Sequence, residues 1–329
     1  MSRAVALRLT VAAVLLVLLG LVSNVSEGQH GRLFKIGALT DAWGPTMGMV
    51  GFRDGLRELG YRENQDYVLG VRFTQGSAAE LPEAARDLVK HGVDVIIVAG
   101  GAAAATAAQS ATAKIPIVFI GGPDPVDTGL VKSFARPGGN ITGIADLEVE
   151  LISKRMEILR EIVPGLKRLL VVYDATNPDA VSKLEAHRGA ARPLGLTLVE
   201  KPVRTEDEAR TAISAARKGE VDGIFAPRSL SLNIPGLILE LASKRSIPAI
   251  FQDAFFVERD GLASYAANTY EVGRQAARLA DRIFKGARPA DLPVEQPTKF
   301  DLVVNVKTAK ALGLTIPPSV LLRADHVIQ

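Results

Sequence analysis

The strongest constraint on the fold is a series of short apolar runs that alternate with amphipathic stretches. This series occurs twice along the chain. The first round predicts strands over 34–39, 67–73, 93–98 and 115–120, with helices over 47–59, 78–91 and 102–113. The second predicts strands over 168–173, 196–203, 222–226 and 247–251, with helices over 178–194, 206–217 and 234–245. Apolar strands separated by helices indicate an α/β fold whose parallel sheets are covered on both faces.

The two rounds also correspond residue by residue. "HGVDVIIVAGG" in the first half matches "GEVDGIFAPRS" in the second, and "AKIPIVFIGG" matches "RSIPAIFQDA". At 329 residues, the chain is long enough for two domains. We therefore interpret the second half as a structural repeat of the first. Two unrelated domains that share only the common pattern of such sheets remain the alternative.

The first 30 residues read differently from the rest. Arg3 and Arg8 precede a run over 9–22 that is apolar except at two positions, and small or polar residues follow. Fourteen helical residues rise about 21 Å, short of the roughly 30 Å of a membrane core. The pattern predicts a signal peptide over 1–30 and a periplasmic protein, with an uncleaved membrane anchor as the alternative.

Composition narrows the chemistry. The chain has no cysteine, which excludes disulfides, thiolate nucleophiles, iron–sulfur clusters and a lipid-anchored N-terminal cysteine. Its four histidines never occur at metal-ligand spacing, so we expect no metal site. Motifs for a nucleophile elbow, a phosphate-binding loop or a dinucleotide are absent, so we expect no catalytic residues and no cofactor. A formal net charge of +3 does not indicate nucleic-acid binding.

Candidate ligand-binding residues follow the predicted strands, because ligands of open α/β sheets bind beyond the carboxyl ends of the strands. In the first half these candidates are Asp41, Trp43, Thr46, Gly100, Gly101, Ala102, Pro123 and Asp124. Trp43 is the chain's single tryptophan and would offer a flat apolar wall and one N–H donor. Packing under its own loop is the alternative. The small residues of "AGGAAAAT" would let a ligand carboxylate approach a helix N-terminus, or would serve only tight packing.

In the second half the candidates are Asp174, Asn177, Arg228, Ser229, Asp253, Phe256 and Tyr265. Arg228 would clamp a ligand carboxylate, or would be an ordinary surface arginine. Each aspartate that follows a strand would pair with a ligand ammonium, or would cap a helix or turn. The aromatic side chains would line the pocket with Trp43, or would pack in the core.

Three long segments carry a resemblance to a known family. They are "DPVDTGLVKSFARPGGNITGI" (124–144), "LREIVPGLKRLLVVYD" (159–174) and "LVVNVKTAKALGLTIPPSVLLRADHVI" (302–328). They resemble ABC transporter substrate-binding proteins of the family that includes tryptophan- and tyrosine-binding members. The similarity runs from Phe34 to the end. The chain departs from the family at Ala266-Ala267, where many members have Gly-Pro, and at Ala175-Thr176, which precede its Asn-Pro pair.

The resemblance implies a type I periplasmic binding protein: two Rossmann-like lobes, a hinge crossed three times, and a ligand in the cleft between them. It implies lobe one over 33–145 and 265–298, and lobe two over 146–264 and 299–329. The chain would be the periplasmic solute-binding component of an ABC importer, a monomer that passes a small organic solute to a membrane permease. An amino acid or similar carboxylate, aromatic or not, fits this role. The alternatives are an exported α/β hydrolase or isomerase using the same cleft, and a sensor that presents its ligand to a receptor.

Overall fold

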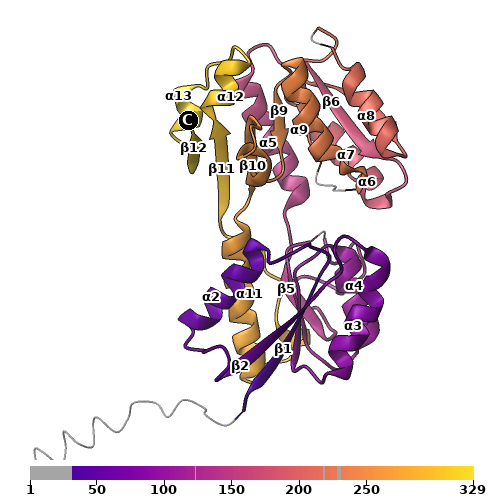
Figure 1. Cartoon of the computed structure of the whole chain (residues 1–329), viewed down its shortest axis with the longest axis vertical. Coiled ribbons are helices and arrows are strands. Elements are labelled where there is room, and N and C mark those ends of the chain that lie inside the picture. The colour runs from indigo at the N-terminus through magenta and orange to yellow at the C-terminus, as the bar shows by residue number, and fades with distance from the viewer. Residues whose placement is uncertain (1–31, 123, 218, 228–230) are drawn as a thin grey trace, which may run out of the picture.

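Two sheets, one in each of two lobes, organise the fold: the first is parallel and the second is parallel except at one strand pair (Figure 1). The computed structural model describes residues 32–122, 124–217, 219–227 and 231–329. The predicted signal peptide, residues 1–30, lies outside the described residues. No helix among those described is both long enough and apolar enough to cross a membrane.

Lobe one contains a five-stranded sheet with the order β2-β1-β3-β4-β5, parallel throughout. Its strands are β1 (Phe34–Thr40), β2 (Tyr67–Phe73), β3 (Val95–Val98), β4 (Ile117–Ile120) and β5 (Ile141–Ile144). The central strand β3 is buried along its whole length, as expected for a strand covered on both faces.

Helices cover both faces of this sheet. One face packs against α3 (Leu81–Lys90) and α4 (Ala102–Ala111), and the other against α2 (Met47–Glu58) and α11 (Thr269–Phe284). Two 3₁₀ turns, η1 (Ala78–Glu80) and η3 (Pro289–Asp291), complete the lobe. Helix α11 comes from the far end of the chain and lies alongside α2 (Figure 1). The lobe is therefore built from two separate chain segments.

Lobe two contains a seven-stranded sheet with the order β12-β11-β10-β9-β8-β6-β7. Its strands are β6 (Arg168–Asp174), β7 (Thr197–Val203), β8 (Gly223–Phe225), β9 (Ala249–Phe251), β10 (Ala263–Ala267), β11 (Phe300–Asn305) and β12 (His326–Ile328). All neighbours are parallel except β10 and β11, which pair antiparallel. That pair runs antiparallel because the chain leaves the lobe along β10 and re-enters along β11.

The helices of lobe two again lie on both faces of the sheet. One face carries α5 (Glu148–Ile162), α7 (Leu184–Ala191), α12 (Val306–Ala311) and α13 (Pro318–Leu321). The other carries α8 (Glu206–Ala215), α9 (Ile234–Arg245) and α10 (Ala254–Val257). The remaining elements are α6 (Pro178–Ser182) and η2 (Ser231–Asn233). The single helix expected over 178–194 is thus two short helices, α6 and α7.

The internal correspondence seen in the sequence has a structural counterpart. Asp94 donates its N–H to the Lys35 carbonyl at 2.7 Å and accepts the Lys35 N–H on Oδ2 at 2.8 Å. Asp222 makes the same two bonds with Arg168, both at 2.8 Å. In each lobe the Val-Asp motif therefore closes the amino end of the first strand against its neighbour, which supports reading the halves as repeats.

Three chain crossings join the lobes. The first lies between β5 and α5, the second between β10 and α11, and the third between η3 and β11. In the second crossing, the ladder extends through Ala267, whose partner is Phe300, so Tyr265 lies in the sheet of lobe two. Ala145 and Glu295 tie the first crossing to the third through a backbone bond of 2.9 Å.

Candidate functional site

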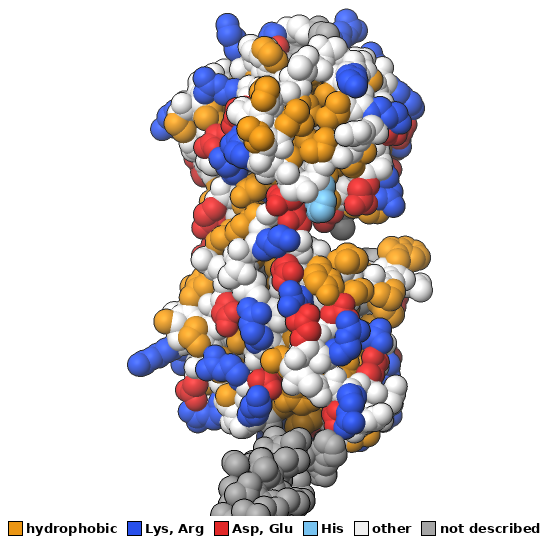
Figure 2. All heavy atoms as spheres, turned by 90° about the vertical axis from the view of Figure 1, so that its left-hand side faces the viewer, with side chains coloured by type: hydrophobic (Ala, Val, Ile, Leu, Met, Phe, Trp, Pro, Cys, Tyr) orange, Lys and Arg blue, Asp and Glu red, His pale blue; other side chains and the backbone are white. Residues whose placement is uncertain are grey.

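The cleft between the lobes is lined by the carboxyl ends of both sets of parallel strands. Strands β1 to β5 of lobe one and β6 to β10 of lobe two end toward the other lobe (Figure 1), whereas β11 and β12 run the opposite way. In the space-filling view the surface narrows to a waist between the lobes and is hollowed on one side of it (Figure 2). This is the position where open α/β sheets bind ligands.

The loop after β1 presents Trp43 to solvent. Thr40 is fully buried, and its hydroxyl donates to the Ala99 carbonyl at 2.7 Å and accepts the Ala42 N–H at 3.1 Å. These bonds fix the exit of β1 against the end of β3. Trp43 follows with 78% of its surface exposed. The alternative of a tryptophan packed under its loop is not what the structure shows.

Asp41 lies beside the start of α4. Its side chain is exposed, and a Cβ placed on Gly100 would lie 3.1 Å from Asp41 Oδ1. Gly101 is the N-cap of α4 and has no side chain to satisfy the first amides, while Ala104 and Ala105 bond back to its carbonyl. The amides of Ala102 and Ala103 therefore have no helical partner. A carboxylate and the positive end of a helix lie side by side at this edge.

Two other candidates of lobe one have side chains that are already engaged. The Thr46 hydroxyl caps α2 by accepting the Met49 N–H at 3.3 Å. Asp124 Oδ1 accepts the N–H groups of Val126 at 2.7 Å and Asp127 at 3.2 Å, which makes it a turn residue. Pro123 lies outside the described residues.

The aspartates of lobe two also hold local structure. Asp174 is buried, and its Oδ1 accepts both the N–H and the hydroxyl of Thr176, at 2.8 and 2.7 Å. Asn177 follows in the same turn and donates its backbone N–H to the Asp174 carbonyl at 3.2 Å. Asp253 caps α10 by accepting the Phe255 N–H at 2.8 Å. These bonds are those of helix caps and turns, the alternative that the sequence offered for aspartates after strands.

The aromatic candidates of lobe two are largely core residues. Phe256 is buried and stacks on Phe251 with 5.2 Å between ring centroids. Tyr265 is half-buried and stacks on Phe300 at 6.0 Å. Phe255, which the sequence places with Phe256 as a possible wall of an aromatic pocket, is 50% exposed beside them, with the Arg259 guanidinium 3.6 Å above its ring. Arg228 and Ser229 lie outside the described residues.

Two further polar residues at the strand ends escaped prediction. Thr74 directly follows β2, and Gln252 directly follows β9. Both are buried, and Thr74 Oγ1 and Gln252 Oε1 have no hydrogen-bond partner among the described residues. A buried polar atom without a partner is costly, so these two groups are suited to a ligand or a water molecule. The signal in the sequence was a polar residue immediately after an apolar strand.

A separate pocket of about 220 Å³ lies within lobe two, between α9, β9 and α12. Its wall includes Leu239, Phe251, Leu262 and Leu312, with Asp260 and Lys307 also lining it. It contains none of the candidate residues and is distinct from the cleft. Across the described parts of the chain, no three acidic or histidine side chains come together to hold a metal ion.

Comparison with known proteins agrees with this architecture. The family model described as "ABC transporter substrate binding protein" matches residues 44–328. A tyrosine-binding protein of Clostridioides difficile (strain R20291) is 28% identical over 265 residues, which cover 80% of this chain and 76% of the relative.

Two solved structures are similar over 90% of this chain and 100% of theirs. An ABC domain from Streptococcus pneumonia in complex with L-Trp is 27% identical, with a TM-score of 0.81. A conserved domain protein from Vibrio cholerae is 31% identical, also with a TM-score of 0.81. The fold is that of a type I periplasmic binding protein, as the sequence predicted.

Proposed function

Because this chain belongs to the ABC transporter substrate-binding protein family, we propose that the solute it captures in the interlobe cleft is a free amino acid. Such a solute carries an ammonium and a carboxylate on one carbon. A matching site therefore needs an anionic group for the ammonium and hydrogen-bond donors for the carboxylate, close together.

The pairing of Asp41 with the N-terminus of α4 is the observation that carries the proposal. The exposed Asp41 carboxylate would receive the ammonium group, and the amides of Ala102 and Ala103 would receive the carboxylate. Gly100 and Gly101 keep the approach open, because a Cβ at Gly100 would crowd Asp41 Oδ1. Both halves of the amino-acid backbone would thus bind to lobe one.

An aromatic side chain on the ligand is favoured by the surface that faces it. Trp43 is largely exposed on the same loop as Asp41, and an exposed indole gains by stacking on another ring. The names of the relatives agree with this, since one is a tyrosine-binding protein and another was solved with L-Trp. We therefore expect tyrosine, tryptophan or phenylalanine to bind more tightly than small amino acids.

Transport follows from closure of the lobes. A ligand held by lobe one and covered by lobe two shifts the chain toward a closed shape, and a permease that recognises this shape receives the loaded protein. On this proposal the chain acts as a monomeric carrier and not as an enzyme.

Export to the periplasm completes the proposal. The pattern of the first 30 residues supports a cleaved signal, with cleavage between residues 23 and 31. Intact-mass measurement on protein from the native host tests this. A shortened periplasmic species supports export, and a full-length species found only with membranes contradicts it.

A thermal-shift screen tests the function itself. Purified protein would be heated with each of the twenty amino acids, with nucleosides and with sugars. A ligand at one hundred times its dissociation constant adds about 2.7 kcal/mol to the stability of the folded state. The proposal predicts shifts with aromatic amino acids and none with sugars or nucleosides. A shift only with a sugar or a nucleoside would refute it.

A further inference from the structure

The three crossings between the lobes are bonded to one another as well as to the lobes. Arg155 of α5 is fully buried, and its Nε donates to the Tyr265 carbonyl at 2.8 Å, which fixes the helix that follows the first crossing to the strand that precedes the second. The buried Gln275 of α11 donates to the Gln296 carbonyl at 3.1 Å and accepts the Thr298 N–H at 3.2 Å. These bonds link α11 to the third crossing, so the hinge is a connected unit.

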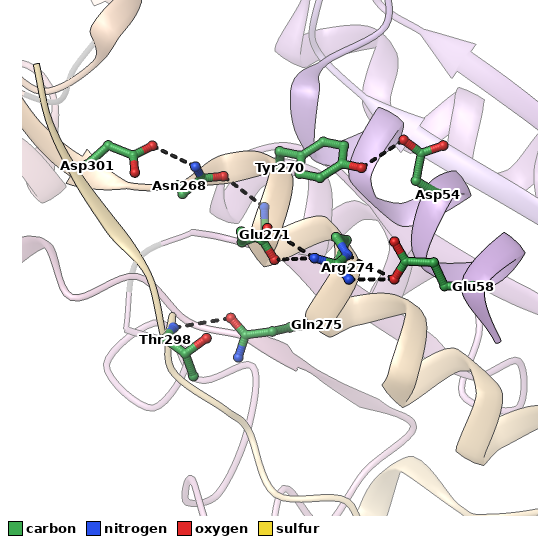
Figure 3. Close-up of polar contacts among 9 residues, drawn as sticks. All are labelled: Asp54, Glu58, Asn268, Tyr270, Glu271, Arg274, Gln275, Thr298 and Asp301. Atoms are coloured by element: carbon green, nitrogen blue, oxygen red, sulfur yellow. Dashed lines mark hydrogen bonds and ion pairs between the residues drawn. The ribbon is translucent and has the colours of Figure 1, made fainter. Parts of the chain in front are cut away.

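Asn268 lies in the second crossing, between β10 and α11, and bonds to both lobes (Figure 3). Its Oδ1 accepts the Glu271 N–H at 2.9 Å and so caps α11 of lobe one. Its Nδ2 donates to Asp301 Oδ2 at 2.6 Å, and Asp301 belongs to β11 of lobe two. Its backbone N–H donates to the Lys299 carbonyl at 2.9 Å. One short side chain thus spans the boundary between the lobes.

Both ends of this connection are rigidly attached. On the lobe-one side, α11 and α2 pack backbone to backbone, because a Cβ on Gly51 would overlap the Tyr270 carbonyl and a Cβ on Gly273 would overlap that of Gly48. The Tyr270 hydroxyl also donates to Asp54 of α2 at 2.8 Å (Figure 3). On the lobe-two side, Asp301 is held in the ladder opposite Ala266. A change at Asn268 therefore acts on two bodies.

Only one of the two carboxylate oxygens of Asp301 has a hydrogen-bond partner among the described residues. Its Oδ2 accepts from Asn268, while its Oδ1 is buried without a hydrogen-bond partner among the described residues. A hydrogen bond to a charged acceptor is stronger than a neutral one. The position is therefore sensitive to which group faces the carboxylate.

We propose that Asn268 and Asp301 form a hinge latch that restricts the angle between the lobes, acting without contact with the ligand. The side-chain amide of Asn268 both caps α11 and donates to the Asp301 carboxylate of β11. A rotation of the lobes that moves α11 away from β11 would therefore break the Asn268–Asp301 hydrogen bond. Loss of the bond would let the lobes sample a wider range of angles.

The absence of cysteine from the chain makes the test direct. Glu83 in α3 and Thr211 in α8 are exposed, and the two helices lie on the side of the molecule away from α11 and β11 (Figure 1). Spin labels would be attached to the double variant Glu83→Cys, Thr211→Cys. Double electron–electron resonance then measures the distribution of distances between the two lobes in ligand-free protein.

The decisive variant is Asn268→Asp at pH 8. Aspartate is as good an N-cap as asparagine, so α11 keeps its cap, while two carboxylates now face each other. The latch predicts a broader or shifted inter-lobe distribution. Adding Asp301→Asn restores an amide facing a carboxylate and should restore the distribution of the parent. Asn268→Ser, which keeps a capping oxygen but removes the amide donor, should also broaden it.

Asn305 offers a matched control within one lobe. It caps α12 by accepting the Thr308 N–H at 2.9 Å and donates from Nδ2 to the Val257 carbonyl at 3.2 Å. Asn305→Ala should lower the melting temperature but leave the inter-lobe distribution unchanged. If Asn268→Asp and Asn268→Ser both keep the parent distribution while folded, the latch is refuted. Because no ligand is used, this outcome is independent of the proposed solute.

Discussion

Asp41 and Gly100 meet at the ends of two adjacent strands, close enough that a Cβ on Gly100 would lie 3.1 Å from Asp41 Oδ1. The glycine therefore sets how near the carboxylate can lie to the start of α4. Because the Asp41 side chain is exposed, we infer that its carboxylate contributes more to ligand binding than to the stability of the fold.

Replacing Asp41 tests the ammonium half of the site. Asp41→Asn should weaken binding of L-tyrosine or L-tryptophan by about 10- to 150-fold, since a hydrogen bond to a charged group contributes about 1.5–3 kcal/mol. Ligand-free stability should hardly change, because the carboxylate is exposed. Calorimetric titration and thermal melts measure the two quantities. Unchanged affinity would remove Asp41 from the site.

Asp124 is the matched control, since it too follows a strand of lobe one. Its carboxylate holds the N–H groups of Val126 and Asp127. Asp124→Ala should therefore cost about 1 kcal/mol of stability, as loss of a capping side chain does, and leave the dissociation constant unchanged. A large loss of affinity with unchanged stability would show that Asp124 contacts the ligand.

Trp43 provides an intrinsic reporter of binding. As the single tryptophan, 78% exposed, it should shift its emission to shorter wavelength when an amino acid and lobe two cover it. Trp43→Ala should weaken binding of aromatic amino acids by about 1–3 kcal/mol while leaving the melting temperature in place. Emission that stays the same at saturating ligand, together with unchanged affinity of Trp43→Ala, would place the indole outside the site.

The contact between α2 and α11 makes a prediction about stability. Gly51→Ala would drive a methyl group into the Tyr270 carbonyl, so it should destabilise the fold by about 1–3 kcal/mol or more through overpacking. Gly189 in α7 is exposed with open space around it, and Gly189→Ala should instead stabilise by about 0.5–1 kcal/mol. Urea unfolding of both variants gives the comparison. Equal effects would show that the close approach of the helices contributes nothing.

The Arg168–Asp222 pair predicts a pH dependence of stability. The Arg168 guanidinium, bonded to Asp222 at 2.9 Å, lowers the pKa of that carboxyl below its ordinary value, with backbone N–H groups adding to the effect. A lowered folded-state pKa gives stability that is present above the unfolded pKa of about 4 and is lost as pH falls through the folded value. Asp222→Asn should therefore destabilise the protein at pH 7 and have little effect near pH 2. A penalty that stays constant between these pH values would exclude the ionic contribution.

The sequence predicted the order of elements well, and the differences have local causes. The strand expected from Val93 begins at Val95, because Asp94 uses its N–H and carboxylate to bond Lys35. The strand expected from Ile115 begins at Ile117, after Pro116, which has no N–H to give. No glycine or proline marks the break between α6 and α7, which the sequence therefore could not show.

The candidate site was harder to predict, because the sequence shows which residues follow a strand but not which are already bonded. Asp41, Asp124, Asp174 and Asp253 look alike in the sequence, yet only the structure reveals that the last three accept amides or hydroxyls from residues two or three places on. The exposure of Trp43 depended on how the Thr40 hydroxyl fixes the turn. Thr74 and Gln252 could be recognised only from the structure, which shows that Thr74 Oγ1 and Gln252 Oε1 are buried without a hydrogen-bond partner among the described residues.

The most direct test of the account is whether the cleft requires both charges of an amino acid. Calorimetric titration would compare L-tryptophan with tryptamine, which lacks the carboxylate, and with indole-3-propionate, which lacks the ammonium. We expect L-tryptophan to bind and each analogue to bind at least about 10-fold more weakly, as follows from loss of a charged hydrogen bond. Equal binding of the three compounds, or binding of neither tryptophan nor any other amino acid, would contradict it.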